Sequence, residues 1–516
     1  MKILLVRPPR YLWPVVNESD NYMLPLGLPA IAAVVRKHMP DAQIKIIDCP
    51  PLKIGWASLA KILKDEDADV VGAGEEALYH HEAVRLFKLA KEINPKVINV
   101  AGGHFFSWTP RESLTNYPID YIVKFEGEYT FLELLKSIRD NKDMSRVMGI
   151  AYRNGTEIIQ TSLRPKISNL DELPIAAYDL IPMGKYSPLG YFWPQGATIE
   201  HSRGCVDKCN FCSLWTFWGD QRKADPEKEE FEVYPAYRTK SVDRTIEEID
   251  ILYNKYNRRY LLWADPTFNV DPKWNDAFCE KLLQRNYKDL YWWAFLRADF
   301  LVRDEKLGIF EKMVKSGLIN AFIGIERKES EDFKKINKCY QEDICREAFS
   351  IMKKKYPVIH RQGTFLTGLR DEKKESLEAL VNYSLDIGVE FMIFHPVTPV
   401  PGTALYQEAV KKGWIAVKDF RQFDWLQPVM STEKLSLEEI TKLTKSASLR
   451  FIIHRWPVAL RGLFSRTRYR RRLYLWFMSI FLNGILNDIK DIIMNRKGPK
   501  GLKRFLLLSK PVWYDS

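Results

Sequence analysis

The chain has 516 residues, of which 46% are hydrophobic and 28% charged, and its formal net charge is +12 at pH 7. This length predicts two or three domains, and the composition is that of ordinary globular domains. No charged and apolar leader opens the sequence, and no apolar run reaches the roughly 18 residues of a spanning helix, so we expect a cytoplasmic protein with reduced cysteines.

Residues 1–140 alternate short β-branched segments with helical patterns. Five β/α units at this spacing predict a doubly wound, flavodoxin-like parallel sheet, which binds ligands at the carboxyl ends of its strands. No GxGxxG or GxxxxGK[ST] motif occurs, which argues against a dinucleotide or Walker-type phosphate site. The expected strands are Lys2–Val6, Ile44–Ile47, Val70–Ala73, Val97–Val100 and Tyr121–Lys124, and the expected helices are Leu28–Met39, Trp56–Lys64, Glu82–Ile93 and Tyr129–Ile138.

Turn residues follow several of these strands, where they are either ordinary tight turns or ligand contacts. Together they resemble the cobalamin-binding domain that precedes many radical S-adenosylmethionine (SAM) cores. The resemblance implies cobalamin contacts at Pro25, Leu26, Gly27, Gly72, Gly102, Gly103, His104, Glu126, Gly127 and Glu128. The DxHxxG motif that supplies a histidine to cobalt in methionine-synthase-like domains is absent, which leaves the lower axial ligand open. His104 is then either a cobalt contact or a hydrogen-bonded turn residue.

Residues 141–195 contain several prolines and weak periodicity, which predict an extended connector. A second β/α series follows, and its six units predict a partial (β/α)6 barrel over residues 196–410, with a mostly helical region at 411–516. The expected strands are Ala197–His201, Tyr260–Ala264, Tyr291–Phe295, Ala321–Ile325, Gly363–Gly368 and Phe391–Val397. The expected helices are Val242–Asn257, Trp274–Arg285, Lys306–Ser316, Asp343–Lys355 and Lys374–Ile387.

Cys205, Cys209 and Cys212 form a CxxxCxxC motif in the loop after the first barrel strand. Three thiolates within eight residues can hold three irons of a [4Fe–4S] cluster and leave the fourth iron open to a small molecule. The alternatives are a structural zinc site or inert thiols. Zinc usually takes four ligands in paired knuckles. The other cysteines show no such pairing; they are Cys49, Cys279, Cys339 and Cys345.

The cysteine spacing, with Phe211 directly before the last cysteine, resembles the signature of radical SAM enzymes. In that family SAM binds the open iron, and one-electron cleavage gives a 5′-deoxyadenosyl radical that abstracts hydrogen from an unactivated carbon. The resemblance therefore implies SAM as a cofactor and an external one-electron donor. Asp265, Arg297 and Glu326 follow barrel strands and fit SAM-binding positions, although each could equally form a strand-end ion pair.

Longer motifs point to one cobalamin-dependent subgroup. Ser202–Trp218 resembles a subgroup that includes hopanoid C-3 methylases and anaerobic magnesium-protoporphyrin IX monomethyl ester cyclases. The Gly-Gly-His turn in Ala101–Ser107 and the segment Asp419–Asp424 are closer to the hopanoid methylases, whereas the Arg- and Tyr-rich C-terminal tail resembles the cyclases. This resemblance implies methylation of an unactivated carbon in an apolar, lipid-like or polycyclic substrate. The alternatives are oxidative cyclisation of the tetrapyrrole type and a non-catalytic sensor that binds cobalamin or the cluster.

The net charge is concentrated near the C-terminal end. Residues Arg450 to Lys510 contain 15 Lys or Arg and two Asp, so the rest of the chain is nearly neutral. The apolar segment Leu473–Leu482 follows an arginine cluster, which favours either a core helix or peripheral contact with the inner face of an anionic membrane. Nucleic acid is the other partner that such charge permits, but no recognition motif occurs, so we expect none.

Overall fold

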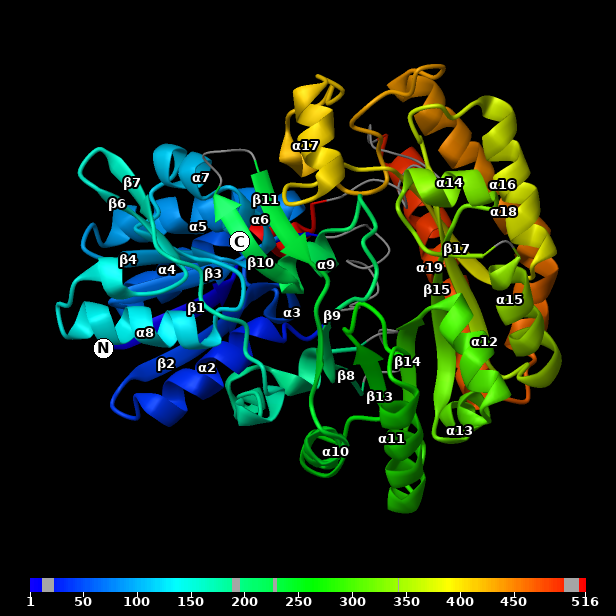
Figure 1. Cartoon of the computed structure of the whole chain (residues 1–516), viewed down its shortest axis with the longest axis horizontal. Coiled ribbons are helices and arrows are strands. Elements are labelled where there is room, and N and C mark those ends of the chain that lie inside the picture. The colour runs from blue at the N-terminus through cyan, green and yellow to red at the C-terminus, as the bar shows by residue number, and fades with distance from the viewer. Residues whose placement is uncertain (12–22, 188–194, 226–229, 342, 496–509) are drawn as a thin grey trace.

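The computed structural model describes residues 1–11, 23–187, 195–225, 230–341, 343–495 and 510–516. Two β-sheets organise these residues, one in the N-terminal third and one in the middle of the chain. Figure 1 shows the N-terminal sheet on the left and the second sheet on the right, with the C-terminal helices behind and beside the second sheet.

The N-terminal sheet has seven strands in the order β2-β1-β3-β4-β5-β6-β7. Its first five strands are parallel and have the flavodoxin-like order, as the sequence predicts. These strands are β1 (Lys2–Arg7), β2 (Gln43–Asp48), β3 (Val70–Gly74), β4 (Ile98–Gly102) and β5 (Tyr121–Val123). Alternate residues of β1 enter two separate cores, because Ile3 and Leu5 face one side of the sheet and Leu4 and Val6 face the other.

Helices cover both faces of this sheet, which makes it doubly wound. One face carries α2 (Gly27–His38) and α8 (Glu128–Arg139), and the other carries α4 (Trp56–Glu66) and α5 (His80–Ile93). Hydrophobic periodicity did not predict three shorter helices, because they span two turns or fewer. They are α3 (Cys49–Leu52), α6 (Gly103–Trp108) and α7 (Pro110–Asn116).

The sheet continues beyond residue 140 through an antiparallel hairpin. β6 (Ile150–Asn154) pairs with β5, and β7 (Glu157–Gln160) pairs with β6. The expected connector, 141–195, therefore begins with ordered sheet and continues with short 3-10 turns. The missed signal is the Asn154-Gly155 dipeptide, which favours a tight hairpin turn.

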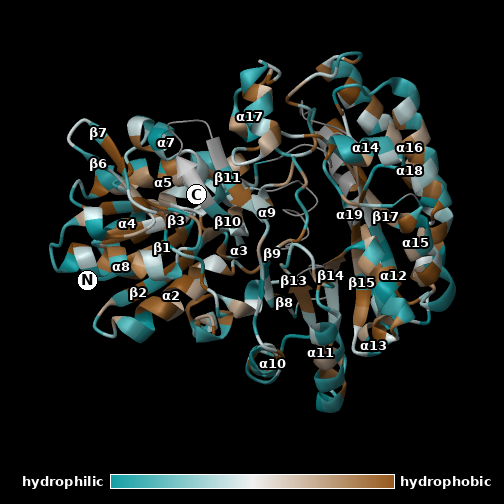
Figure 2. Cartoon of the chain, in the orientation of Figure 1, coloured by the Kyte–Doolittle hydropathy of each residue, from teal (hydrophilic) through white to brown (hydrophobic). Residues whose placement is uncertain are grey.

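The second sheet consists of six parallel strands in the order β17-β16-β15-β14-β13-β8. Its strands are β8 (Gly196–Ile199), β13 (Tyr260–Trp263), β14 (Tyr291–Leu296), β15 (Leu318–Glu326), β16 (His360–Thr367) and β17 (Phe391–Pro396). The intervening helices are α10 (Val242–Asp250), α11 (Pro272–Arg285), α12 (Ala298–Lys306), α13 (Ile309–Lys315), α14 (Ser330–Lys335), α15 (Ile344–Lys355) and α16 (Lys374–Asp386). This arrangement confirms the predicted partial (β/α)6 barrel. Figure 2 shows brown, apolar strands and teal outer helices such as α10.

A small β-rich segment lies between the two sheets. It contains β9 (Ser202–Gly204), α9 (Ser213–Trp218), β10 (Asp220–Asp225), β11 (Glu230–Tyr234) and β12 (Tyr237–Thr239). β9 pairs antiparallel with β12, and β10 pairs with β11. The cysteine motif joins β9 to α9, which Figure 1 shows beside the N-terminal unit. Arg203 of β9 forms ion pairs with Glu126 and Glu128 of that unit.

The C-terminal region follows α17 (Ala404–Lys411) and is dominated by two long helices, α18 (Leu437–Leu463) and α19 (Arg468–Ile493). The start of α19 closes the N-terminal ends of the barrel strands, where Tyr469, Leu473 and Trp476 pack in one cluster with Tyr260 of β13. The Tyr469 and Tyr260 hydroxyls lie 3.2 Å apart. The first part of the apolar segment Leu473–Leu482 therefore belongs to a core helix.

Residues 511–516 return to the N-terminal unit. The short 3-10 helix η9 (Val512–Asp515) contacts α4. Tyr514 donates a 2.6 Å hydrogen bond to Glu82 and packs edge-on against Trp56. The C-terminal region thus contacts the barrel through α19 and the N-terminal unit through η9.

Candidate active site

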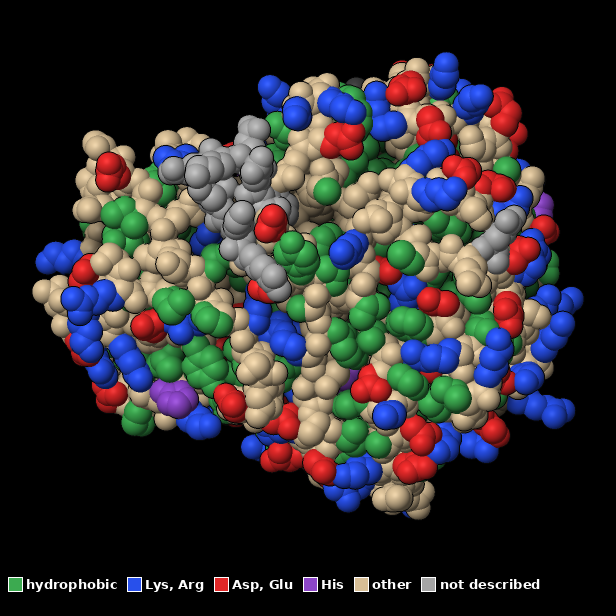
Figure 3. All heavy atoms as spheres, viewed as in Figure 1, with side chains coloured by type: hydrophobic (Ala, Val, Ile, Leu, Met, Phe, Trp, Pro, Cys, Tyr) green, Lys and Arg blue, Asp and Glu red, His purple; other side chains and the backbone are tan. Residues whose placement is uncertain are grey.

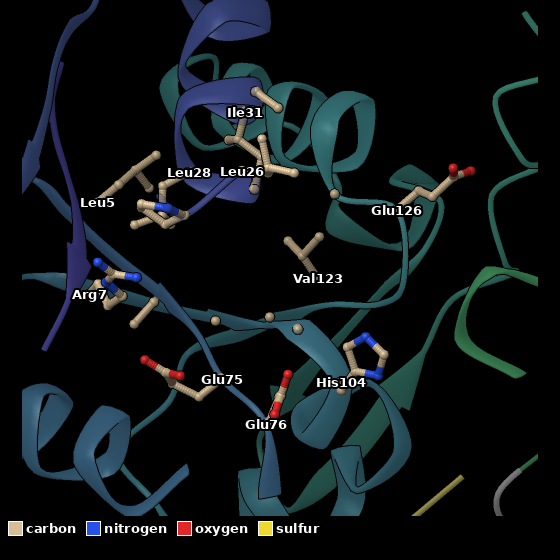
Figure 4. Close-up of a pocket in the computed structure, with 18 of the residues that line it drawn as sticks. Leu5, Arg7, Leu26, Leu28, Ile31, Glu75, Glu76, His104, Val123 and Glu126 are labelled. Atoms are coloured by element: carbon tan, nitrogen blue, oxygen red, sulfur yellow. The ribbon is translucent and has the colours of Figure 1, made fainter. Parts of the chain in front are cut away.

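A cavity of about 530 Å³ lies at the carboxyl ends of the N-terminal strands. Its walls include the ends of β3, β4 and β5, the start of α2, and residues of the cysteine-bearing segment. All ten residues expected to contact cobalamin line this one cavity: Pro25, Leu26, Gly27, Gly72, Gly102, Gly103, His104, Glu126, Gly127 and Glu128. Figure 4 shows Leu26, Leu28 and Ile31 on one side and Glu75, Glu76 and His104 on the other.

The Gly102-Gly103 turn forms part of the cavity floor. Gly103 has a φ of +82°, and a Cβ atom there would lie 2.8 Å from the backbone nitrogen of Glu75. The ends of β3 and β4 can therefore approach each other only because position 103 has no side chain. The result is a low, open surface that suits a broad planar ligand.

His104 stacks on Phe217 of α9, with ring centroids 3.9 Å apart and an interplanar angle of 13°. Burial lowers the pKa of His104 to about 4, so the imidazole is neutral at physiological pH. This stacking joins the cavity to the helix that follows the cysteine motif. A neutral imidazole is able to ligate a metal, and cobalt contact by His104 stays a prediction.

Glu126 and Glu128 bind an arginine of the cysteine-bearing segment. Arg203, two residues before Cys205, lies 2.6 Å from Glu128, 3.2 Å from Glu126 and 2.8 Å from Glu200. Burial tends to lower the pKa of Arg203, but the three carboxylates raise it above its usual value, so the guanidinium stays charged. This buried network ties the N-terminal unit to the barrel.

Cys205, Cys209 and Cys212 lie on a loop held by several hydrogen bonds. The side-chain amide of Asn210 donates to Lys335 O at 2.8 Å, that of Asn337 donates to Lys208 O at 2.9 Å, and Leu405 N donates to Asn210 O at 3.0 Å. The segment after α14 and the start of α17 thus fix the loop from two sides.

The three thiols are close enough to affect one another electrostatically. Burial raises the pKa of Cys212 to about 11, with a further contribution from Cys205. Burial also raises the pKa of Cys209, which is 7% exposed. Within the described ranges, no three His, Cys, Asp or Glu side chains converge on a single metal ion. Three thiols on one loop fit a cubane, because each binds a different iron.

The four residues expected to contact SAM lie around this loop, and SAM contact stays a prediction for each of them. Phe211 packs against the main core. Asp265 is fully buried, and its Oδ1 accepts hydrogen bonds from Ser202 N and Oγ, both at 2.5 Å, so it holds the residues that lead into the loop.

The charged side chains of Arg297 and Glu326 lie near the cysteine loop. Arg297 forms an ion pair with Asp207, which lies between the first two cysteines, and a second one with Asp299 at 2.7 Å. Glu326 ends β15 at a φ of +62° and accepts a 3.1 Å hydrogen bond from Lys338. An arginine suits the SAM carboxylate and an acid suits its amino group.

Sequence reasoning missed several residues that line the cavity: Arg10, Glu75, Glu76, Arg203, Phe217 and Trp218. Glu75 and Glu76 come directly after β3. Their position at the carboxyl edge of a parallel sheet could have identified them as candidate ligand contacts. Arg203 carries no such signal, since its partners Glu126 and Glu128 are far away in the sequence.

A family model and several curated relatives match this chain. A B12 binding domain family matches residues 12–135. An uncharacterized methyltransferase of Pyrococcus horikoshii is 30% identical over 88% of this chain and 93% of its own length. The anaerobic magnesium-protoporphyrin IX monomethyl ester cyclase of Rubrivivax gelatinosus is 28% identical over 80% of this chain and 71% of its own. The hopanoid C-3 methylase of Methylococcus capsulatus is 24% identical over 89% of this chain and 82% of its own.

Among solved structures, the cobalamin-dependent SAM radical enzyme OxsB, with aqua-cobalamin and SAM bound, matches with a TM-score of 0.67 and 18% identity. The match covers 96% of this chain and 73% of OxsB, and it confirms the fold class that the sequence predicts. The chain belongs to the family of cobalamin-binding radical SAM enzymes, whose cofactors are a [4Fe–4S] cluster, SAM and cobalamin.

Proposed function

We propose that the protein methylates an unactivated carbon of an apolar, lipid-like or polycyclic substrate. One observation carries the proposal: the strand-end cavity is walled partly by Ser202, Arg203, Phe217 and Trp218, which flank the cysteine motif. A corrin in this cavity would therefore lie beside the loop that holds the cluster. Methyl donor and radical source would then face one substrate.

When bound, the cofactors supply a one-electron route to a hydrogen-abstracting radical and a transferable methyl group. The balanced reaction converts a substrate C–H, two SAM and two electrons into C–CH₃, S-adenosylhomocysteine, methionine and 5′-deoxyadenosine. An external donor supplies the electrons. In the chain, Cys205, Cys209 and Cys212 hold the cluster, while Arg297 and Glu326 orient SAM.

The barrel interior supports an apolar substrate. Along β14, the inward-facing Tyr291, Trp293 and Phe295 are half-buried, whereas the alternate residues are buried against the outer helices. The same alternation occurs on β17. Phe322 extends this aromatic wall, with its ring centroid 5.1 Å from that of Phe295. Half-buried aromatic rings inside a barrel favour a substrate with flat, apolar surfaces.

Anaerobic reconstitution with iron, sulfide and cobalamin tests the proposal. With methyl-labelled SAM and reductant, we expect 5′-deoxyadenosine and transfer of label to substrates drawn first from membrane lipids. Cys209→Ala should abolish 5′-deoxyadenosine formation, whereas Cys339→Ala, an exposed cysteine outside the motif, should not. Full SAM cleavage by Cys209→Ala would contradict the cluster assignment.

The second candidate is oxidative cyclisation, favoured by the 28% identity to the Rubrivivax gelatinosus cyclase. It uses the same cofactors but adds no methyl group to the product. Formation of 5′-deoxyadenosine and an oxidised product without label would therefore support the cyclase and exclude methylation.

We also propose peripheral contact with an anionic membrane through α18 and α19. No helix in the described part of the chain is long and apolar enough to cross a membrane. Most exposed large hydrophobic side chains of the described residues nevertheless lie on these two helices at helical spacing. They form one stripe of Leu449, Ile453, Trp456, Leu460 and Phe464 and another of Leu475, Leu482, Leu486, Ile489 and Ile493.

Exposed arginines accompany these stripes: Arg450, Arg461, Arg466, Arg468 and Arg471. This charge suits anionic lipid headgroups and would repel the same face of a second copy. On the face in Figure 3, by contrast, acidic and basic side chains are interspersed.

Vesicle flotation, together with sedimentation, tests whether this surface binds an anionic membrane or a second copy of the chain. We expect binding to vesicles that contain phosphatidylglycerol, weaker binding to phosphatidylcholine alone, and loss of binding in Phe464→Glu. Leu307→Glu is the matched control, because Leu307 is 59% exposed in the turn between α12 and α13, away from α18 and α19. Dimers in sedimentation without vesicle binding would instead assign the surface to a second copy.

A further inference from the structure

Glu75 has an unused hydrogen-bond acceptor in a buried position. The residue is 5% exposed, and its Oε2 lies 2.5 Å from Nη1 of Arg10. Its Oε1 has no hydrogen-bond partner. Arg10 is itself fixed, because its guanidinium lies 4.4 Å from the ring centroid of Tyr79. One oxygen of a held carboxylate thus remains free.

The carboxylate that carries this free oxygen belongs to a residue that lines the cavity at the strand ends. Glu75 follows β3 directly and lines the cavity together with Glu76 and Arg10. Figure 4 shows Glu75 and Glu76 on the side opposite Leu26 and Ile31. The carboxylates therefore face an apolar wall across the space that a ligand would fill.

A buried acceptor without a partner costs roughly 1–3 kcal/mol, and more when it is charged. A ligand that fills the cavity and brings a donor to this carboxylate would therefore remove the cost. The rim of a corrin carries primary carboxamides, whose N–H groups are suitable donors. An anionic or purely apolar ligand would leave the oxygen unsatisfied and would add repulsion or desolvation.

We propose that Glu75, held by Arg10, accepts a hydrogen bond from a carboxamide on the rim of bound cobalamin. The inference rests on the proposed function, since it needs cobalamin in this cavity. Glu75 is thus a specificity-determining contact that neither the sequence motifs nor the comparisons assign.

The proposal implies a pH dependence of cobalamin binding. Burial raises the pKa of Glu75 to about 7, while Arg10 and Arg7 act to lower it and Glu76 and Glu82 act to raise it. A donor from the ligand favours the ionised carboxylate. The affinity for cobalamin should therefore fall as the pH drops below about 7, by up to about tenfold per pH unit.

Titration of the whole protein with hydroxocobalamin, followed by absorbance, tests the contact. Glu75→Ala should weaken binding about tenfold or more, which is the effect expected of a charge-assisted hydrogen bond. Glu75→Gln keeps an acceptor oxygen, so it should lose less affinity but lose the pH dependence. Glu92 is an exposed glutamate of the same unit, so Glu92→Gln should bind hydroxocobalamin with the affinity of the unsubstituted protein at every pH.

The outcomes separate this inference from the proposed function. If the unchanged protein binds no cobalamin, the proposed function fails. If it binds cobalamin and both Glu75 variants bind equally well with the same pH profile, the inference alone is overturned. Electron paramagnetic resonance of the cob(II)alamin complex adds a second readout. A changed cobalt spectrum with unchanged affinity would place Glu75 at an axial position and overturn the rim contact. Circular dichroism of each variant checks that it is folded.

Discussion

At the scale of single residues, the cysteine motif depends on the glycine that precedes it. Gly204 has a φ of +99°, and a Cβ atom there would collide with the carbonyl oxygen of Ala236 on the approach to β12. The first cysteine therefore leaves β9 in a direction that only glycine permits at this contact.

Gly204→Ala should consequently disturb the loop and reduce its iron and sulfide content after reconstitution. Gly155→Ala is the matched control, because Gly155 has a φ of +61° but open space around it. Both positions have a positive φ that disfavours alanine by about 1–2 kcal/mol or more, and Gly204 alone adds the collision. Equal iron content in the two variants would show that the close approach to β12 is not required.

Arg203 is the second residue whose replacement is informative. It is 3% exposed and neutralises carboxylates from both units. Arg203→Met would leave the buried Glu128 and the partly buried Glu200 without this partner, whereas Glu126 keeps Arg238. We expect a loss of about 3–5 kcal/mol in the free energy of unfolding, measured by denaturant titration. Arg146→Met, where the side chain is 88% exposed, should cause no measurable loss.

At the scale of elements, the start of α19 acts as the floor of the barrel. Leu473→Ala removes a side chain that is 2% exposed and packs against β13, so we expect destabilisation of about 2–5 kcal/mol. Leu475→Ala changes the same residue type on the same helix, but Leu475 is 43% exposed, and its effect should stay within about 0.5 kcal/mol. Similar losses for the two variants in chemical denaturation would mean that α19 does not close the barrel.

The elements also show what sequence alone could and could not provide. The five parallel strands of residues 1–140 and the six barrel strands were predictable, because buried strands alternate with amphipathic helices at a regular spacing. The hairpin Ile150–Gln160 was missed because it is short and follows the periodic region. The ten cavity residues were predictable because the strand-end turns resemble those of a cobalamin-binding domain. The partners of Glu126 and Glu128 were not predictable, since Arg203 meets them only through the packing of two separate units.

At the scale of the whole molecule, the cavity connects the N-terminal unit and the barrel. A ligand that binds only the folded protein at 100 times its dissociation constant adds about 2.7 kcal/mol to the free energy of unfolding. Since residues of both units line the cavity, hydroxocobalamin should protect both units from proteolysis. Mass spectrometry of the proteolytic fragments measures the protection of each unit separately. Protection confined to residues before 140 would indicate that the barrel contributes nothing to cobalamin binding.

The contact between Tyr514 and Glu82 joins residues 432 positions apart. During translation at about 5–20 residues per second, roughly 20–90 s separate the synthesis of the two partners. The N-terminal sheet emerges from the ribosome long before η9 exists to cover Trp56 and Glu82. In that interval the nascent chain leaves Trp56 uncovered by Tyr514, and Glu126 and Glu128 lack Arg203 until the barrel segment follows. This interval is therefore the stage at which a chaperone would find these N-terminal side chains accessible.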